Sequence, residues 1–178
     1  MAQGEAFSAA LVAPAVTYIC KWLARHSKLP VRHGSALDSQ VEVHIAGSAR
    51  RRVKEIHDVD LVVALPEECP RPCREWGNEH MRFERGGAYV QRWRYAAALP
   101  VELYLTDHVA KGATLLHCTG AVEFNVWMRL RAIQSGMRLS QWGLFKGDEL
   151  VAARTEADVF HALDVPFVPP WRRQGPPT

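Results

Sequence analysis

The chain has 178 residues, 48% of them hydrophobic and 23% charged, with a formal net charge of +3 at pH 7. This length allows one domain or two small ones with a real core, and the composition excludes a disordered chain, a collagen-like repeat and a disulfide-stapled miniprotein. No apolar run reaches the ~18 residues of a membrane span, and the basic residues Lys21, Arg25 and Lys28 follow the apolar stretch, the reverse of a signal peptide. We therefore expect an intracellular, cytoplasmic protein without a membrane partner.

The first half of the chain combines one helix with several strands. Apolar residues at helical spacing predict a helix over residues 5–28, with Ile19 and Leu23 toward the core. Residues 29–40 predict a loop and residues 66–87 an irregular segment. Strands are expected where apolar and polar residues alternate or apolar residues run together, at 41–46, 58–65, 88–95 and 100–106.

The second half is mainly helical. We expect helical structure from about residue 108 to 135, a short hairpin around Lys146–Asp148, and a helix that starts at Thr155, where Asp158 completes a capping box. The fold class is therefore α+β, with a mixed sheet and helices first and a small, mainly helical part with a short hairpin after it. The two domains are expected at residues 1–107 and 108–178.

Cys69 and Cys73 stand close together in the sequence, separated by two prolines and an arginine. One interpretation is a redox-sensitive disulfide, and another is half of a zinc site, for which His80 is the nearest further ligand. The third interpretation, two unpaired cysteines in a loop, is the one that we favour.

Three acidic residues are expected on one face of the sheet. Asp58 and Asp60 lie two apart on a predicted strand, so their carboxylates emerge on the same side, about 6.6 Å apart along the strand. Glu102 alternates with apolar neighbours on another strand and points away from the core. If the two strands are neighbours, the three acids meet, and oxygen ligands without nearby His or Cys favour Mg²⁺ or Mn²⁺. Such a set is the minimum for two-metal phosphoryl transfer, whereas separated acids would be ordinary solvent-facing strand residues.

A glycine–serine turn and three arginines precede these acids. Backbone amides and the Ser48 hydroxyl can approach a phosphate closely beside Gly47, and Arg51 adds a cation with a planar fork. Taken alone, Gly47 and Ser48 indicate a turn, and the arginines a solvated face. Their spacing to Asp58 and Asp60 favours phosphate binding.

Gly47-Ser48 followed ten residues later by Asp58 and Asp60 resembles the signature of the nucleotidyltransferase superfamily. Downstream motifs resemble, in order, the thumb of the family X DNA polymerases, so that the resemblance covers roughly residues 41–170. It implies a nucleotidyltransferase palm followed by a thumb, the plan of the smallest family members. The thumb motifs are His117-Cys118-Thr119-Gly120, then Asn125 and Arg129, then the segments 139–145, 155–160 and 166–170.

The resemblance implies a role for each matching residue. Asp58, Asp60 and Glu102 match the catalytic carboxylates that hold two Mg²⁺ ions, for which Mn²⁺ can substitute. Asn125 and Arg129 match residues that contact DNA in the minor groove, and the helical residues opposite them, Val126, Trp127, Leu130 and Ile133, are expected in the thumb core. The nucleotide-binding positions are Gly47, Ser48, Arg51, His117, Cys118, Thr119 and Gly120.

The sequence departs from the family pattern at three positions. Glu102 stands where the family has Asp, Cys118 where an aromatic residue is usual, and His57 where Gly is frequent. Because Cys118 is smaller than an aromatic residue, we expect weaker discrimination against ribonucleotides.

These features predict a template-directed DNA polymerase that adds dNTPs to a primer 3′-hydroxyl and fills short gaps during DNA repair. We expect a monomer that binds primer–template or gapped DNA, and a viral origin agrees with the minimal plan. Two alternatives are a small nucleotidyltransferase that modifies a protein or RNA end, and a non-catalytic DNA-end-binding module.

Overall fold

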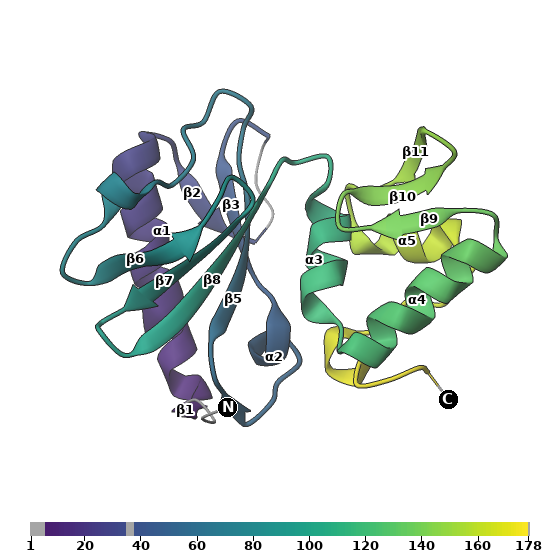
Figure 1. The fold of residues 1–178 in the computed structure, drawn as a ribbon, viewed down its shortest axis with the longest axis horizontal. Coiled ribbons are helices and arrows are strands. Elements are labelled where there is room, and N and C mark those ends of the chain that lie inside the picture. Colours follow the sequence, from purple (N-terminus) through teal and green to yellow (C-terminus); the bar gives the residue numbers. More distant parts are fainter. Residues whose placement is uncertain (1–5, 35–37, 178) are drawn as a thin grey trace. The chain divides into compact units, whose positions relative to one another are not determined.

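A computed structural model of the protein describes residues 6–34 and 38–177. The chain divides into two compact units, Met1–Asp107 and His108–Thr178 (Figure 1). Each unit has its own hydrophobic core, so each is described by itself. No helix within the described ranges combines the length and apolar character that crossing a membrane requires.

The first unit is built on a six-stranded mixed sheet with the strand order β2-β3-β5-β8-β7-β6. The pairs β2–β3 and β5–β8 are parallel, and the other neighbouring pairs are antiparallel. The expected α+β class with a mixed sheet is confirmed. The strands are β2 (Val31–His33), β3 (Val41–Ile45), β5 (Val59–Ala64), β6 (Met81–Gly86), β7 (Val90–Tyr95) and β8 (Leu99–Thr106).

Helix α1 (Val12–Ser27) covers one face of this sheet. Its buried side chains Ile19, Trp22 and Leu23 pack in one core with Leu61 of β5 and Leu103 of β8. Because strand side chains alternate between faces, the residues between these apolar ones project from the opposite face. Short elements complete the unit: β1 (Phe7–Ser8), which pairs with β4 (Glu55–Ile56), and η1 (Ala9–Leu11), α2 (Gly47–Arg50) and η2 (Arg74–Trp76).

One helix boundary and two segment assignments predicted from the sequence of this unit were wrong. The helix predicted over residues 5–28 begins only at Val12, so that Pro14 falls in its first turn, where its missing N–H costs nothing. The predicted loop at 29–40 contains β2, and the predicted irregular segment contains β6. Strand β6 carries exposed Arg82 and Arg85 at the sheet edge, so its pairing with β7 rather than an apolar pattern defines it.

The second unit packs three helices with a three-stranded antiparallel sheet of order β11-β10-β9. Thr155 and Asp158 form the predicted capping box, and the predicted hairpin turns at Gly147, whose φ is +58°. The elements are α3 (Lys111–Thr119), α4 (Val122–Gln134), β9 (Arg138–Ser140), β10 (Gly143–Lys146), β11 (Glu149–Ala152), α5 (Glu156–Ala162) and η3 (Pro170–Arg172).

The predicted core face of α4 was largely wrong. Val126, Leu130 and Ile133 are 48%, 52% and 66% exposed, and only Trp127 of the predicted set packs partly against the core. The buried stripe is instead Phe124, Met128 and Ala132. Both stripes have helical spacing and both are apolar, so periodicity alone could not decide which of them faces inward.

Arg173 lies at the centre of the second unit's core and is fully buried. Its guanidinium forms an ion pair with buried Glu156, donates to the Val168 carbonyl at 2.8 Å, and lies 5.3–5.6 Å from the ring centres of three phenylalanines. Charge pairing, a hydrogen bond and aromatic faces together compensate the guanidinium for lost water. The rings are those of Phe124, Phe160 and Phe167.

We predict that Arg173→Ala lowers the free energy of unfolding by about 3–5 kcal/mol, because Glu156 would remain buried without its partner. The neighbouring Arg172 is exposed, so Arg172→Ala serves as the matched control and is expected within about 0.5 kcal/mol of wild type. Urea unfolding monitored by tryptophan fluorescence measures both. Equal stability of the two variants would contradict the role given to Arg173.

Candidate active site

The structure brings Asp60 and Glu102 side by side. Strands β5 and β8 are parallel neighbours, and Asp60 stands in direct register with Glu102. Both side chains project from the sheet face opposite α1, because Leu61 and Leu103, the next residues along, belong to the core that α1 covers. Asp58 immediately precedes β5, close enough for its charge to act on Asp60.

The electrostatics of this face disfavour three ionised acids. Burial, followed by the charges of Asp58 and Glu102, raises the pKa of Asp60 to about 7. Burial and the charge of Glu102 also raise the pKa of Asp58. Arg92 acts in the opposite direction on both carboxyls, and Arg51 on Asp60, but these cations do not fully compensate. A site that makes carboxylates repel is one that favours a bound cation.

Glu102 is held by two neighbours on the sheet. The carboxylate accepts a hydrogen bond from Arg92 at 2.8 Å and another from the Tyr104 hydroxyl at 2.9 Å. Arg92 lies opposite Glu102 in the register of β7 with β8, and its guanidinium is also 3.5 Å from Glu84. Sequence reasoning missed Arg92 and Tyr104, although the alternation that placed Glu102 on this face also places Tyr104 there.

Gly47 fits against Asp60 because it has no side chain. It begins the short helix α2 with φ of +55°, a left-handed value that favours glycine. A Cβ atom at this position would lie 1.8 Å from Oδ2 of Asp60. The backbone also joins the two segments, since the Ala46 amide donates to the Asp60 carbonyl at 2.8 Å. The turn with Ser48 therefore lies directly beside the acids, with Arg51 at its end.

The donor chemistry of this face suits a hard divalent cation. Asp58 and Asp60 supply only carboxylate oxygens, and their raised pKa values show that positive charge is undersupplied. Across residues 6–34 and 38–177, no three His, Cys, Asp or Glu side chains are grouped so as to hold one metal ion. Glu102, bound to Arg92 and Tyr104, is the carboxylate whose present contacts compete with metal binding.

Cys69 and Cys73 form no disulfide, and among the described residues they are not grouped with further His, Cys, Asp or Glu side chains that could hold a metal ion. Cys69 is buried, which raises the pKa of its thiol, and its Sγ lies 3.6 Å from the Pro70 carbonyl oxygen. His80, the further ligand considered for zinc, is 3.5 Å from Glu79. The structure agrees with two unpaired cysteines.

In the second unit, His117 lies at the centre of the predicted nucleotide and DNA contacts. Asn125 donates from Nδ2 to the His117 carbonyl at 2.7 Å, and Arg129 lies 3.1 Å from His117 Nδ1. Because a guanidinium can only donate, Nδ1 must accept, which places the proton of the neutral imidazole on Nε2. Burial and the Arg129 charge both lower the pKa of His117, which favours this neutral form.

The remaining residues of this turn differ in exposure. Cys118 is half-buried and Thr119 is fully buried. Gly120 separates α3 from α4, and a Cβ atom there would lie 2.5 Å from Oδ1 of Asn125. Glycine at this position therefore allows Asn125 to approach the backbone and reach His117.

Comparisons with known proteins show which proteins the chain is similar to. The family model of the DNA polymerase beta thumb matches residues 114–174. DNA polymerase IV of Saccharomyces cerevisiae is 37% identical over 62 residues, covering 35% of this chain and 11% of its own length. Repair DNA polymerase X of African swine fever virus is 26% identical over 140 residues, covering 71% of this chain and 78% of its own length. The chain is a relative of the family X DNA polymerases.

A solved structure shows the same fold. The Leishmania infantum polymerase beta in a ternary P/T complex superposes with a TM-score of 0.75 at 21% identity, covering 96% of this chain and 77% of that one. The fold likeness therefore includes both units of this chain. The match to the yeast relative spans about a tenth of that protein's length.

The raised pKa of Asp60 predicts a pH-dependent penalty on stability. A carboxyl that binds its proton more tightly in the folded state contributes its full stability below its unfolded pKa, near 3.8, and loses it as the pH rises through about 7. In chelator, Asp60→Asn should therefore resemble wild type at pH 4 and be more stable at pH 8, by on the order of 2–4 kcal/mol. Urea unfolding at both pH values measures this, and a variant that is no more stable at pH 8 would contradict the electrostatics described.

Proposed function

We propose that the protein is a template-directed DNA polymerase that adds dNTPs to a primer 3′-hydroxyl and fills short gaps in DNA repair. The observation that carries this proposal is the packing of the Gly47–Ser48 turn against Asp60, in register with Glu102, in a chain whose second unit matches a polymerase thumb. The viral relative, which is named a repair polymerase, supports the proposal over most of its own length.

The first unit acts as the palm in this proposal, over residues 1–107. Asp58 and Asp60 would hold two Mg²⁺ ions, for which Mn²⁺ can substitute, and Glu102 would supply the third carboxylate. Bound ions would supply the positive charge that lowers the pKa of the primer hydroxyl and offsets the charge of the triphosphate and of the departing pyrophosphate. Gly47, Ser48 and Arg51 bind the β- and γ-phosphates, because the turn offers amides and a hydroxyl, and Arg51 supplies positive charge beside Asp60.

The second unit acts as the thumb, over residues 108–178. The turn His117–Gly120 lies against the sugar of the incoming nucleotide, with Cys118 as the side chain nearest to its 2′ position. Asn125 and Arg129 contact the minor-groove side of the DNA, and their hydrogen bonds to His117 link these contacts to the nucleotide turn. The protein acts as a monomer on primer–template or gapped DNA.

A gap-filling assay tests the function directly. With Mg²⁺ or Mn²⁺, the wild type is expected to insert labelled dNTP opposite a one-nucleotide template gap, selecting the complementary base. Asp58→Asn and Asp60→Asn should each reduce insertion by at least about a thousandfold, because each removes a carboxylate that would hold the ions. Both variants should still bind gapped DNA, because phosphate contacts elsewhere carry the affinity.

The same assay separates the alternatives. Label transferred to a protein or to an RNA end would indicate a nucleotidyltransferase of another kind. Retention of gapped DNA without any incorporation would indicate a DNA-end-binding module. Near wild-type insertion by Asp58→Asn or Asp60→Asn would contradict the assignment of the site.

Glu102 provides a sharper prediction about geometry. Its carboxylate reaches Arg92 and the Tyr104 hydroxyl at 2.8 and 2.9 Å, so the structure is fitted to the longer side chain. We expect Glu102→Asp to slow single-turnover insertion at least tenfold, which corresponds to about 1.4 kcal/mol. A faster Glu102→Asp variant would mean that glutamate holds the ion imperfectly, and an unimpaired Glu102→Ala variant would remove this residue from the site.

A further inference from the structure

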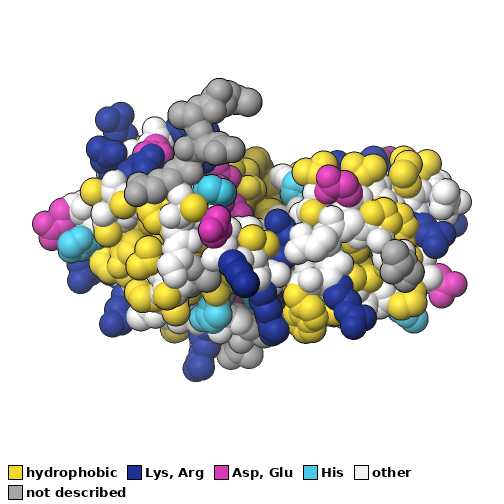
Figure 2. All heavy atoms as spheres, turned by 90° about the horizontal axis from the view of Figure 1, so that it is seen from below, with side chains coloured by type: hydrophobic (Ala, Val, Ile, Leu, Met, Phe, Trp, Pro, Cys, Tyr) yellow, Lys and Arg dark blue, Asp and Glu magenta, His cyan; other side chains and the backbone are white. Residues whose placement is uncertain are grey.

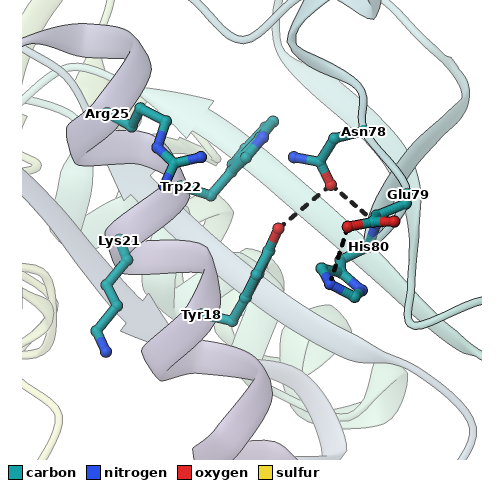
Figure 3. A pocket seen from close by; sticks show the side chains of 7 residues that line it. All are labelled: Tyr18, Lys21, Trp22, Arg25, Asn78, Glu79 and His80. Carbon is teal, nitrogen blue, oxygen red and sulfur yellow. Dashed lines mark hydrogen bonds and ion pairs between the residues drawn. The ribbon is translucent and has the colours of Figure 1, made fainter.

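A pocket of about 310 Å³ lies in the first unit, between α1 and the segment that leads into β6. Figure 3 shows Tyr18 and Trp22 on α1 facing Asn78 and His80 across this hollow. The pocket is distinct from the carboxylate face, because α1 covers the opposite side of the sheet from Asp60 and Glu102. Its volume is at the lower end of the range for small-molecule sites, about 300–1,000 Å³.

The pocket is preorganised by Asn78. Its Oδ1 atom accepts hydrogen bonds from the Tyr18 hydroxyl at 3.2 Å and from the amides of His80 and Met81 at 2.8 and 2.9 Å. The side-chain oxygen is therefore fully used, and the amide nitrogen is the group left to donate to a ligand. In Figure 3 this nitrogen points toward Trp22, into the hollow.

The aromatic wall is fixed by the core behind it. Trp22 is 3% exposed, and its indole donates to the Trp76 carbonyl at 2.9 Å. The Tyr18 ring is half-buried, 5.2 Å from the ring of Tyr95 and 5.6 Å from that of His80. Trp22 therefore holds Tyr18 from behind, and a flat apolar group can stack on the Tyr18 ring without the protein having to order that ring first.

Two cations stand on the same helix face. Tyr18, Lys21, Trp22 and Arg25 are spaced three and four residues apart, so they are neighbours along α1. Lys21 and Arg25 are exposed and form no ion pair with the residues that the structure describes. On the face shown in Figure 2, Lys and Arg side chains occur at several separate places among side chains of other kinds.

We propose that this pocket binds an unpaired nucleotide of single-stranded DNA. The base stacks on the half-buried ring of Tyr18 and accepts a hydrogen bond from Asn78, while Lys21 and Arg25 contact the adjoining phosphates. Aromatic faces beside cations are the combination that binds single strands with little sequence preference. Glu79, whose side chain is 85% exposed at the rim, opposes the phosphates and limits the affinity.

The test is the binding of a fluorescent oligothymidine of about twelve nucleotides, followed by anisotropy in chelator so that no metal-dependent chemistry contributes. Lys21→Ala/Arg25→Ala should bind at least about tenfold more weakly, and the slope of log affinity against log salt should become shallower by about 1.4. The matched control, Arg32→Ala/Arg85→Ala, removes two exposed arginines of the same unit outside the pocket. Equal losses in the two double variants would overturn the proposal.

Two further comparisons address the pocket chemistry. Tyr18→Phe keeps the ring and should bind like wild type, whereas Tyr18→Leu keeps bulk without a π face and should bind about fivefold more weakly or worse. Glu79→Gln should bind more tightly. Unchanged affinity in Tyr18→Leu would overturn the stacking.

A photocrosslink locates the bound base. An oligothymidine with 5-iododeoxyuridine should crosslink to peptides that contain Tyr18, Trp22 or His80, as identified by mass spectrometry. Crosslinks confined to other segments would overturn the site. This result is independent of gap filling, because it requires neither a duplex nor incorporation.

Discussion

The protein holds Asp58, Asp60 and Glu102 close together on one sheet face against their mutual repulsion. This repulsion disfavours the ionised form of Asp60, whose pKa is raised to about 7 by burial and by its two acidic neighbours. Arg92 from the next strand pairs with Glu102, and Arg51 lowers the pKa of Asp60 from the adjoining turn. These arginines reduce the repulsion without removing it, so the fold keeps a locally unfavourable charge arrangement that a divalent cation would relieve.

Two glycines, which have no side chain, are as important to this arrangement as the charges are. In the first unit Gly47 lies where a Cβ atom would overlap Asp60, and in the second Gly120 lies where a Cβ atom would overlap Asn125. In each unit, a proposed functional side chain therefore approaches a backbone turn that only glycine leaves open. The spacing between the Gly47–Ser48 motif and the acids lets the turn pack on the strand that carries Asp60.

The sequence predicted the parts of the structure that depend on local pattern. Alternation placed Glu102 beside Asp60 once β5 and β8 were neighbours, and residues Thr155 and Asp158 formed the capping box expected of them. Strand β6 was missed because it is defined by pairing with β7, and the buried face of α4 was misassigned because two apolar stripes compete on it. The Arg92–Glu102 pair depends on cross-strand register, which no local pattern encodes.

The most direct test of the central claim is the linkage between divalent cations and folding. A ligand that binds only the folded state raises the free energy of unfolding by RT ln(1 + [L]/Kd). At pH 8, where Asp60 is ionised, Mg²⁺ should raise the free energy of unfolding by at least about 1 kcal/mol. The effect should be smaller at pH 5 and absent in Asp58→Asn/Asp60→Asn. An equal effect of Mg²⁺ on wild type and the double variant would contradict the account.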